Sequence, residues 1–273
     1  MHQHKKILLM LYFGIIKKRR DMKNFKLLYI FSILGLFLTS CDPSVTSPGA
    51  SDESAVTFLP LITLEGSDVV LDCDATSYSD PGAVASAGGV EIDLETSVSG
   101  KYFGGTSVTD GPDVYLVSYS AFNDDGIPAT ENRVVLYPEC NGDLVTSIAG
   151  MYTASVSRDG SSPTGYQDNG PFIIKDLGDD RYAISDAQGG WYEYGRGLGV
   201  TYATLGMVLK ANNIAANDFT SEGTVSTGTF GGTNTFTSLT VDPVAKTLTL
   251  RVNWDAGPYT FVTVFTQTDE YYN

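Results

Sequence analysis

The residues best suited to bind a ligand lie in one short segment between glycines. Residues 189–197 read GGWYEYGRG and contain Trp191, Tyr192, Glu193, Tyr194 and Arg196. Aromatic rings stack on the apolar faces of sugar rings, while neighbouring acids and amides bind the hydroxyl groups. In a strand, Trp191 and Glu193 point one way and Tyr192 and Tyr194 the other, so we expect one of these faces to be exposed. The alternative is packing in a core or at a sheet edge.

Other side chains give weaker candidates. Tyr166 lies in the polar loop 161–170 and is a further candidate for ligand binding. Trp254 shares one face of a predicted strand with Leu248, Leu250 and Val252, so we expect it in the core. Acidic stretches could supply oxygen ligands to calcium, but turns favour the same residues for backbone reasons, and we predict no metal site. These stretches are Asp72 with Asp74, residues 110–113, residues 123–125 and residues 179–180.

The composition excludes several kinds of catalytic site. Both histidines, His2 and His4, precede the body of the protein. Sites of the Ser-His-Asp or Cys-His type and zinc sites with histidine ligands are therefore excluded. A carboxylate pair could hydrolyse a glycosidic bond, but too many acids are present to single one out. We predict no catalytic residue, no cofactor and no enzymatic activity, with a carboxylate-based hydrolase as the remaining enzymatic alternative.

The charge is distributed unevenly along the chain. The whole sequence has 17 basic and 32 acidic residues, and eight of the basic but one of the acidic residues precede Cys41. The remainder therefore has 9 basic and 31 acidic residues, a net charge of −22. Nucleic-acid binding needs clustered Lys and Arg, so nucleic acid is excluded as a partner. The same charge disfavours anionic polysaccharides, so we expect any glycan ligand to be neutral.

The N-terminal residues predict export and lipidation. Residues 22–40 combine Lys23 and Lys26 with a 12-residue apolar run, which is typical of a signal peptide and too short to span a membrane. The following sequence LTSC resembles a bacterial lipobox, which implies a lipid on Cys41; the alternative is ordinary cleavage nearby, with Cys41 incidental. Residues 1–21 precede Met22, and we interpret them as a mis-annotated start. Residues 41–55, rich in Ser, Pro and Asp, predict a flexible tether.

The two cysteines beyond Cys41 are Cys73 and Cys140. Export to an oxidising compartment permits a disulfide between them. The alternative is two independent thiols, with Cys73 buried as a small core residue. The sequence leaves both readings open.

The body of the chain predicts an all-β protein with two domains. Short alternating runs are separated by Gly, Asp-Gly, Asn and Pro from Val56 onward, without helical periodicity. We expect a β-sandwich over residues 56–138 and a second antiparallel domain, a β-barrel or curved β-sandwich, over residues 144–273. The segment 211–219 fits no strand, and a short helix is one interpretation.

One hairpin carries a resemblance to a known family. The pattern of Tyr115, Val117, Tyr119, Ala121, Asn123, Gly126, Arg133 and Val135 resembles the last hairpin of bacterial Ig-like surface modules. Together with the lipobox, this layout is similar to a family of Bacteroidetes-type surface lipoproteins with an N-terminal Ig-like module and a C-terminal β-rich domain. The resemblance implies a location on the outer membrane facing the exterior, and an association with glycan uptake. It implies no catalytic residue.

These observations give an expected function and its alternative. We expect a non-catalytic, lipid-anchored protein of the outer-membrane surface that binds a glycan or another ligand for polysaccharide uptake, with the Ig-like domain as a spacer. The alternative is a structural or adhesive module that docks to a surface partner such as an outer-membrane transporter complex.

Overall fold

The computed structural model describes residues 56–270. The described residues from Thr57 onward belong to one compact unit. The predicted start artefact at 1–21, the signal peptide at 22–40, the lipidated Cys41 and the tether at 41–55 lie outside the described residues. Within the described range, no helix is long and apolar enough to cross a membrane.

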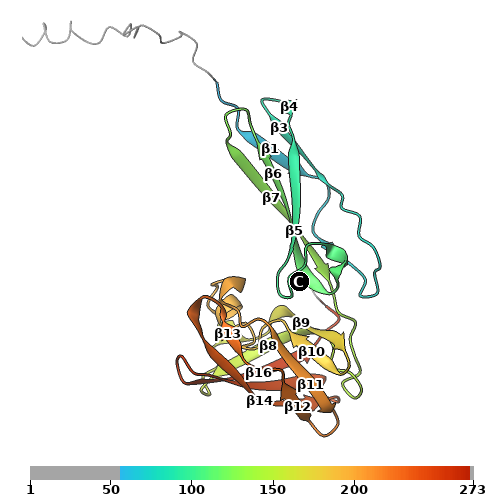
Figure 1. Cartoon of the computed structure of the whole chain (residues 1–273), viewed down its shortest axis with the longest axis vertical. Coiled ribbons are helices and arrows are strands. Elements are labelled where there is room, and N and C mark those ends of the chain that lie inside the picture. The colour runs from blue at the N-terminus through green and yellow to red at the C-terminus, as the bar shows by residue number, and fades with distance from the viewer. Residues whose placement is uncertain (1–55, 271–273) are drawn as a thin grey trace, which may run out of the picture. The chain divides into compact units, whose positions relative to one another are not determined.

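The structure is all-β, as the alternating pattern predicts (Figure 1). Only 3-10 turns and one π-helical turn interrupt the strands of residues 56–270. The first seven strands are β1 (Pro60–Leu64), β2 (Val69–Val70), β3 (Ala83–Ala87), β4 (Val90–Glu91), β5 (Leu94–Gly100), β6 (Asp113–Phe122) and β7 (Pro128–Tyr137), with the turn η1 (Val108–Asp110). They form two small sheets, in the orders β1-β3-β4 and β2-β7-β6-β5.

These two sheets share one core and make an N-terminal sandwich. The inward side chains of β6 and β7 follow the hairpin pattern: Tyr115, Val117, Tyr119, Ala121 and Val135 are all buried. Ile62 of β1 and Ala85 of β3 pack against them from the other sheet. Alternation along a half-buried strand therefore identified this core correctly. The Ig-like assignment of the sandwich stays a prediction.

Arg133 is the polar centre of this sandwich. Its guanidinium is fully buried, forms an ion pair with Asp80 and donates to the Tyr119 hydroxyl. It also donates to the backbone oxygens of Glu65, which directly follows β1, and Gly82, which directly precedes β3. A buried arginine is tolerated when its donors are satisfied, and here the partners come from both sheets.

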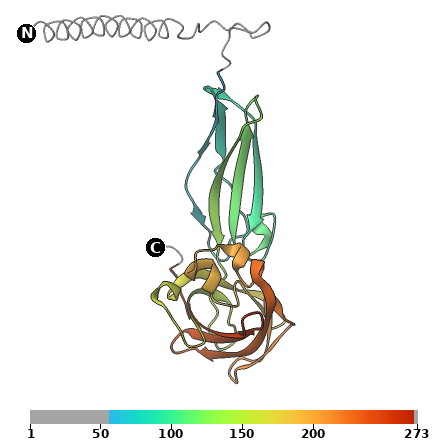
Figure 2. The same cartoon turned by 90° about the vertical axis from the view of Figure 1, so that its left-hand side faces the viewer.

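The rest of the chain forms one nine-stranded sheet in the order β12-β11-β10-β9-β8-β16-β15-β14-β13. Every neighbouring pair is antiparallel, and the sheet curls into a half-barrel, seen best in Figure 2. The strands are β8 (Gly150–Arg158), β9 (Asn169–Gly178), β10 (Arg181–Ile184), β11 (Met207–Asn213), β12 (Asp218–Ser221), β13 (Val225–Thr227), β14 (Gly231–Asp242), β15 (Thr247–Trp254) and β16 (Tyr259–Gln267). The turns are η2 (Thr164–Tyr166), η3 (Trp191–Gly195), η4 (Val200–Tyr202) and η5 (Gly228–Phe230).

The concave face of the half-barrel holds the larger core. Leu248, Leu250, Val252 and Trp254 of β15 are buried there, which confirms the prediction for this strand. Phe172 and Phe265 pack edge to face beside them. Segment 211–219, for which a helix was considered, instead ends β11 and begins β12, and Asn217 in the connection adopts φ 53°. The helix interpretation is wrong because a left-handed residue forms a hairpin turn there.

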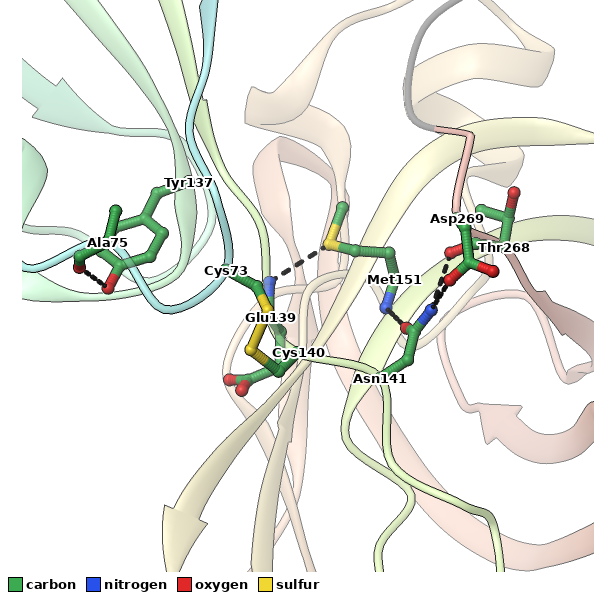
Figure 3. The surroundings of a disulfide bond; sticks show 9 residues. All are labelled: Cys73, Ala75, Tyr137, Glu139, Cys140, Asn141, Met151, Thr268 and Asp269. Carbon is green, nitrogen blue, oxygen red and sulfur yellow. Dashed lines mark hydrogen bonds between the residues drawn. A yellow bond between two sulfur atoms is a disulfide. The ribbon is translucent and has the colours of Figure 1, made fainter.

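A disulfide joins Cys73, which follows β2, to Cys140, which follows β7 (Figure 3). The chain then passes between the two groups of sheets through residues 138–149. Asn141 fixes this passage, because its side chain accepts from the Met151 backbone and donates to the Thr268 oxygen. The two-domain division at this passage stays a prediction.

Candidate functional site

The predicted ligand segment forms a π-helical turn. Gly189 and Gly190 have φ values of 59° and 74°, which glycine adopts without strain. A Cβ at Gly190 would lie 2.7 Å from the Phe172 ring, so only glycine fits. After these glycines the Gly195 N–H donates to the Gly190 oxygen at 3.0 Å, an i to i+5 bond. The expectation of a strand at 191–194 is therefore wrong, because the paired glycines turn the chain back on itself.

The turn buries most of the candidate residues. Trp191, Tyr192 and Glu193 are 3%, 4% and 5% exposed, whereas Tyr194 is partly buried and Arg196 is exposed. The expectation that two of the four side chains form an exposed face is thus also wrong. A turn directs successive side chains around its axis. Here Trp191 and Tyr192 point into a group of aromatic rings, whereas Glu193 and Tyr194 point toward the N-terminal sandwich.

Trp191, Tyr192 and Arg196 belong to what we call the aromatic–arginine cluster. Its members are Arg158, Tyr166, Trp191, Tyr192, Arg196, Phe230 and Tyr259. Tyr166 stacks on Trp191 with ring centroids 4.0 Å apart, so this predicted candidate does join the segment. The Arg158 guanidinium lies over the rings of Trp191 and Tyr259, at 4.9 and 4.2 Å.

The second half of the cluster surrounds Tyr192. Phe230 lies 4.9 Å from its ring, and the Arg196 guanidinium lies 5.6 Å from it. Burial raises the pKa of the Tyr192 hydroxyl, whereas the nearby charges of Arg158 and Arg196 lower it. Both arginines therefore lie near one hydroxyl. Phe230 remains 45% exposed, and Tyr166 and Tyr259 are partly exposed, so the cluster reaches the surface.

Glu193 and Tyr194 lie instead against the N-terminal sandwich, in a group that we call the polar joint. Lys101 Nζ lies 2.6 Å from Glu193 Oε1 and 3.1 Å from the Tyr194 hydroxyl. The Tyr102 hydroxyl donates to Glu193 Oε1 at 3.1 Å and lies 2.8 Å from that of Tyr194. Burial lowers the pKa of Lys101, but Tyr194 and Glu193 outweigh burial and raise it.

A second buried carboxylate lies beneath the turn. Asp186 accepts hydrogen bonds from the backbone of Gln188, Gly190 and Thr204. Burial raises its pKa to about 6, and the charge of Glu193 adds to this rise. Glu193 Oε2 is buried without a hydrogen-bond partner in the described part of the chain. Burial of these two carboxylates is unfavourable, and the backbone hydrogen bonds of Asp186 hold the chain where the turn begins.

An apolar cleft of about 510 Å³ lies beside the polar joint. Its lining includes Leu116 and Val134 from the sandwich and Pro171, Tyr194 and Val200 from the half-barrel, with Lys101 as its cation. Neither Asp186 nor Glu193 lines this cleft.

Three of the four acidic stretches serve the backbone, whereas Asp72 and Asp74 of the fourth are exposed. Asp110 accepts from the N–H groups of Thr106 and Ser107, and Asn123 accepts from those of Asp125 and Ile127. Asp179 and Asp180 are turn residues with φ values of 54° and 57°. Over residues 56–270, no group of three or more metal-binding side chains comes together.

The sequence alone does not identify several members of the aromatic–arginine cluster and the polar joint. Phe230, Tyr259, Lys101, Tyr102 and Asp186 come from distant strands and turns, and nothing in their local sequence marks them. Arg158 carries one signal in the sequence, because it is among only nine basic residues after Cys41.

The comparisons with known proteins concern the fold. A family model of a C-terminal domain matches residues 141–267, which span β8 to β16. The crystal structure of the lipoprotein BT2262 from Bacteroides thetaiotaomicron is similar to this chain, with 23% identity, a TM-score of 0.53, and coverage of 77% of this chain and 100% of that one. No curated protein matches the sequence. The chain therefore shares the fold of a Bacteroides lipoprotein, while the Ig-like character of its N-terminal sandwich stays a prediction.

Proposed function

We propose that the protein is a lipid-anchored lipoprotein on the outer face of the outer membrane, and that its half-barrel binds a glycan without catalysis in support of polysaccharide uptake. The N-terminal sandwich is the spacer between the anchor and the binding domain. The observation that carries this proposal is the aromatic–arginine cluster, which combines surface-accessible rings with polar side chains at one place.

The cysteines support the anchor. Because Cys73 and Cys140 bond to each other, Cys41 is the cysteine left for lipidation. BT2262, whose fold is similar, is itself a lipoprotein. We expect palmitate labelling of the full chain in a Bacteroides host and recovery in the membrane fraction, and loss of both in Cys41→Ser. An unlabelled wild-type protein would contradict the anchor.

The cluster has the features of a sugar site. Sugar rings stack on exposed aromatic rings, and Phe230, Tyr166 and Tyr259 offer such rings within one group. Arginine donors beside them match sugar hydroxyl oxygens. Tyr166 and Phe230 pack against buried Trp191 and Tyr192, respectively, and this preorganisation lowers the entropy lost on binding.

The carboxylates support a non-catalytic role. A glycosidase needs two carboxyl groups facing each other across an accessible cleft. Asp186 and Glu193 are close enough to influence each other, but both are buried and Glu193 is paired with Lys101.

A glycan array with residues 42–273, which include the whole compact unit, tests the proposal. We expect binding to be weakened at least tenfold by Phe230→Ala and by Tyr166→Ala. The matched control is Phe122→Ala, which removes an exposed phenylalanine of the N-terminal sandwich and should leave binding unchanged. A blank array for the folded protein would contradict glycan binding.

The alternative, a docking module for a surface protein, is favoured by a different observation. Leu59, Leu61, Val84 and Val90 are exposed on or beside the β1-β3-β4 sheet. A photo-crosslinking residue at Leu61 would capture a protein partner in cells under the docking function, whereas one at Phe230 would not.

A further inference from the structure

We infer that the glycan bound by the aromatic–arginine cluster is acidic, and that Arg158 and Arg196 bind its carboxylate or sulfate group. This inference rests on the proposed function and names the ligand class. It departs from the neutral glycan expected from net charge, because that expectation treated the charge of the body as uniform.

Aromatic rings hold the guanidinium groups of Arg158 and Arg196 in place, but no carboxylate of the described chain neutralises their charge. Aromatic rings cover their faces, at 4.2 and 4.9 Å for Arg158 and 5.6 Å for Arg196. Across residues 56–270, neither forms an ion pair. Within the described chain neither guanidinium donates a hydrogen bond to a protein acceptor, although both charges lie near the Tyr192 hydroxyl and lower its pKa. Each arginine thus presents the fork of N–H donors that binds an anionic group in a bidentate manner.

Trp191, which lies beneath Arg158, does not compete with a ligand for the arginine donors. The indole Nε1–H of Trp191 has no acceptor within the described structure, although the residue is 3% exposed. An indole nitrogen only donates, as does a guanidinium. Trp191 therefore offers the arginines no acceptor, and its own N–H is too deeply buried to meet a ligand from outside. The two arginines are the groups of the cluster that would meet a negatively charged oxygen atom of a ligand.

Basic residues are scarce after Cys41, and two of them lie in this cluster. After Cys41 the sequence has nine basic residues against 31 acidic ones. Four of the other seven basic residues, Lys101, Arg133, Arg181 and Lys210, are paired with carboxylates. The excess negative charge acts mainly at long range, where salt screens it within about 8 Å at physiological ionic strength. Contacts inside the cluster are screened less.

The test compares oligosaccharides that differ only in charge. Isothermal titration of residues 42–273 would use an oligogalacturonide and its methyl ester, and a sulfated chondroitin oligosaccharide beside its desulfated form. We expect the charged member of at least one pair to bind at least tenfold more tightly than the uncharged or less charged member. The uronate pair identifies a carboxylate ligand, and the chondroitin pair identifies a sulfate.

Variants assign the effect to the arginines. Arg196→Gln and Arg158→Gln should each weaken the charged ligand about tenfold or more and remove its advantage, while Arg196→Lys should recover part of it. Arg251→Gln, which changes an exposed arginine elsewhere on the half-barrel, is the matched control. Equal affinity within both pairs would overturn this inference and leave glycan binding intact. An absence of binding to any glycan would overturn both.

Discussion

Lys101 Nζ lies 2.6 Å from Glu193 Oε1, so a cation of the N-terminal sandwich meets the turn that carries the aromatic–arginine cluster. Lys101 follows β5, whereas Glu193 lies 92 residues further along the chain in η3. The same turn thus directs Trp191 and Tyr192 into the cluster and Glu193 into the polar joint. The geometry of the proposed binding site therefore depends on a contact outside it.

Breaking this ion pair should destabilise the protein. Lys101→Met leaves Glu193 as a buried carboxylate without its cation, and we expect a loss of about 3 kcal/mol in the free energy of unfolding, measured with urea. Lys101→Met combined with Glu193→Gln should lose less than the sum of the two single variants. Lys210→Met is the control, because its pair with Asp180 is exposed and spans 3.7 Å; it should lose less than about 1 kcal/mol. Equal losses for both lysines would contradict the role of the joint.

Asp186 should make stability depend on pH. Its pKa is about 6 in the folded protein, above its value of 3.8 in the absence of burial, so the folded state binds the proton more tightly. Its contribution is therefore unfavourable above pH 6 and is relieved as the pH falls toward 4. When the pH is lowered from 7 to 4.5, we expect protonation of this group to increase the free energy of unfolding by about 2 kcal/mol.

Asp186→Asn provides the comparison, because asparagine does not titrate. The difference in stability between wild type and Asp186→Asn should change by that amount between pH 4.5 and pH 7, with the wild type relatively more stable at the lower pH. A difference that is constant with pH would show that the carboxyl group is not perturbed.

Arg133 should be essential to the N-terminal sandwich. Arg133→Met removes the partner of Asp80 and leaves the Glu65 and Gly82 oxygens without their donor, so we expect a loss of about 3 to 5 kcal/mol. Arg181→Met, which breaks an exposed pair with Glu222, should lose less than about 1 kcal/mol. Similar urea midpoints for the two variants would count against this role.

The disulfide should stabilise the fold substantially. Cys73 and Cys140 are 67 residues apart, and a loop of this length corresponds to about 4 kcal/mol of stabilisation. Cys73→Ser and Cys73→Ser with Cys140→Ser should show the same loss, and so should the reduced wild type. A single variant much less stable than the double one would indicate damage from the substitution itself.

Much of the fold followed from strand alternation, but the site did not. The buried faces of β6, β7 and β15 were predictable because each strand buries one side. Buried side chains such as Tyr119 and Leu250 therefore occupy every second position. The same rule failed at Trp191–Tyr194, where Gly189 and Gly190 replace extended backbone with a turn. Arg158, Phe230 and Lys101 join the turn only through tertiary packing, which local sequence does not encode.

The central claim is that a glycan binds at the aromatic–arginine cluster, and tryptophan fluorescence tests it most directly. The chain has two tryptophans: Trp191 is in the cluster, and Trp254 packs against Tyr192 and Tyr259. Titration of residues 42–273 with a glycan identified on the array should change the emission until it saturates. The dissociation constant from this curve should equal the one measured by calorimetry, and Phe230→Ala should raise it at least tenfold. A glycan that binds by calorimetry without altering the emission, or with the same affinity for Phe230→Ala, would contradict the claim.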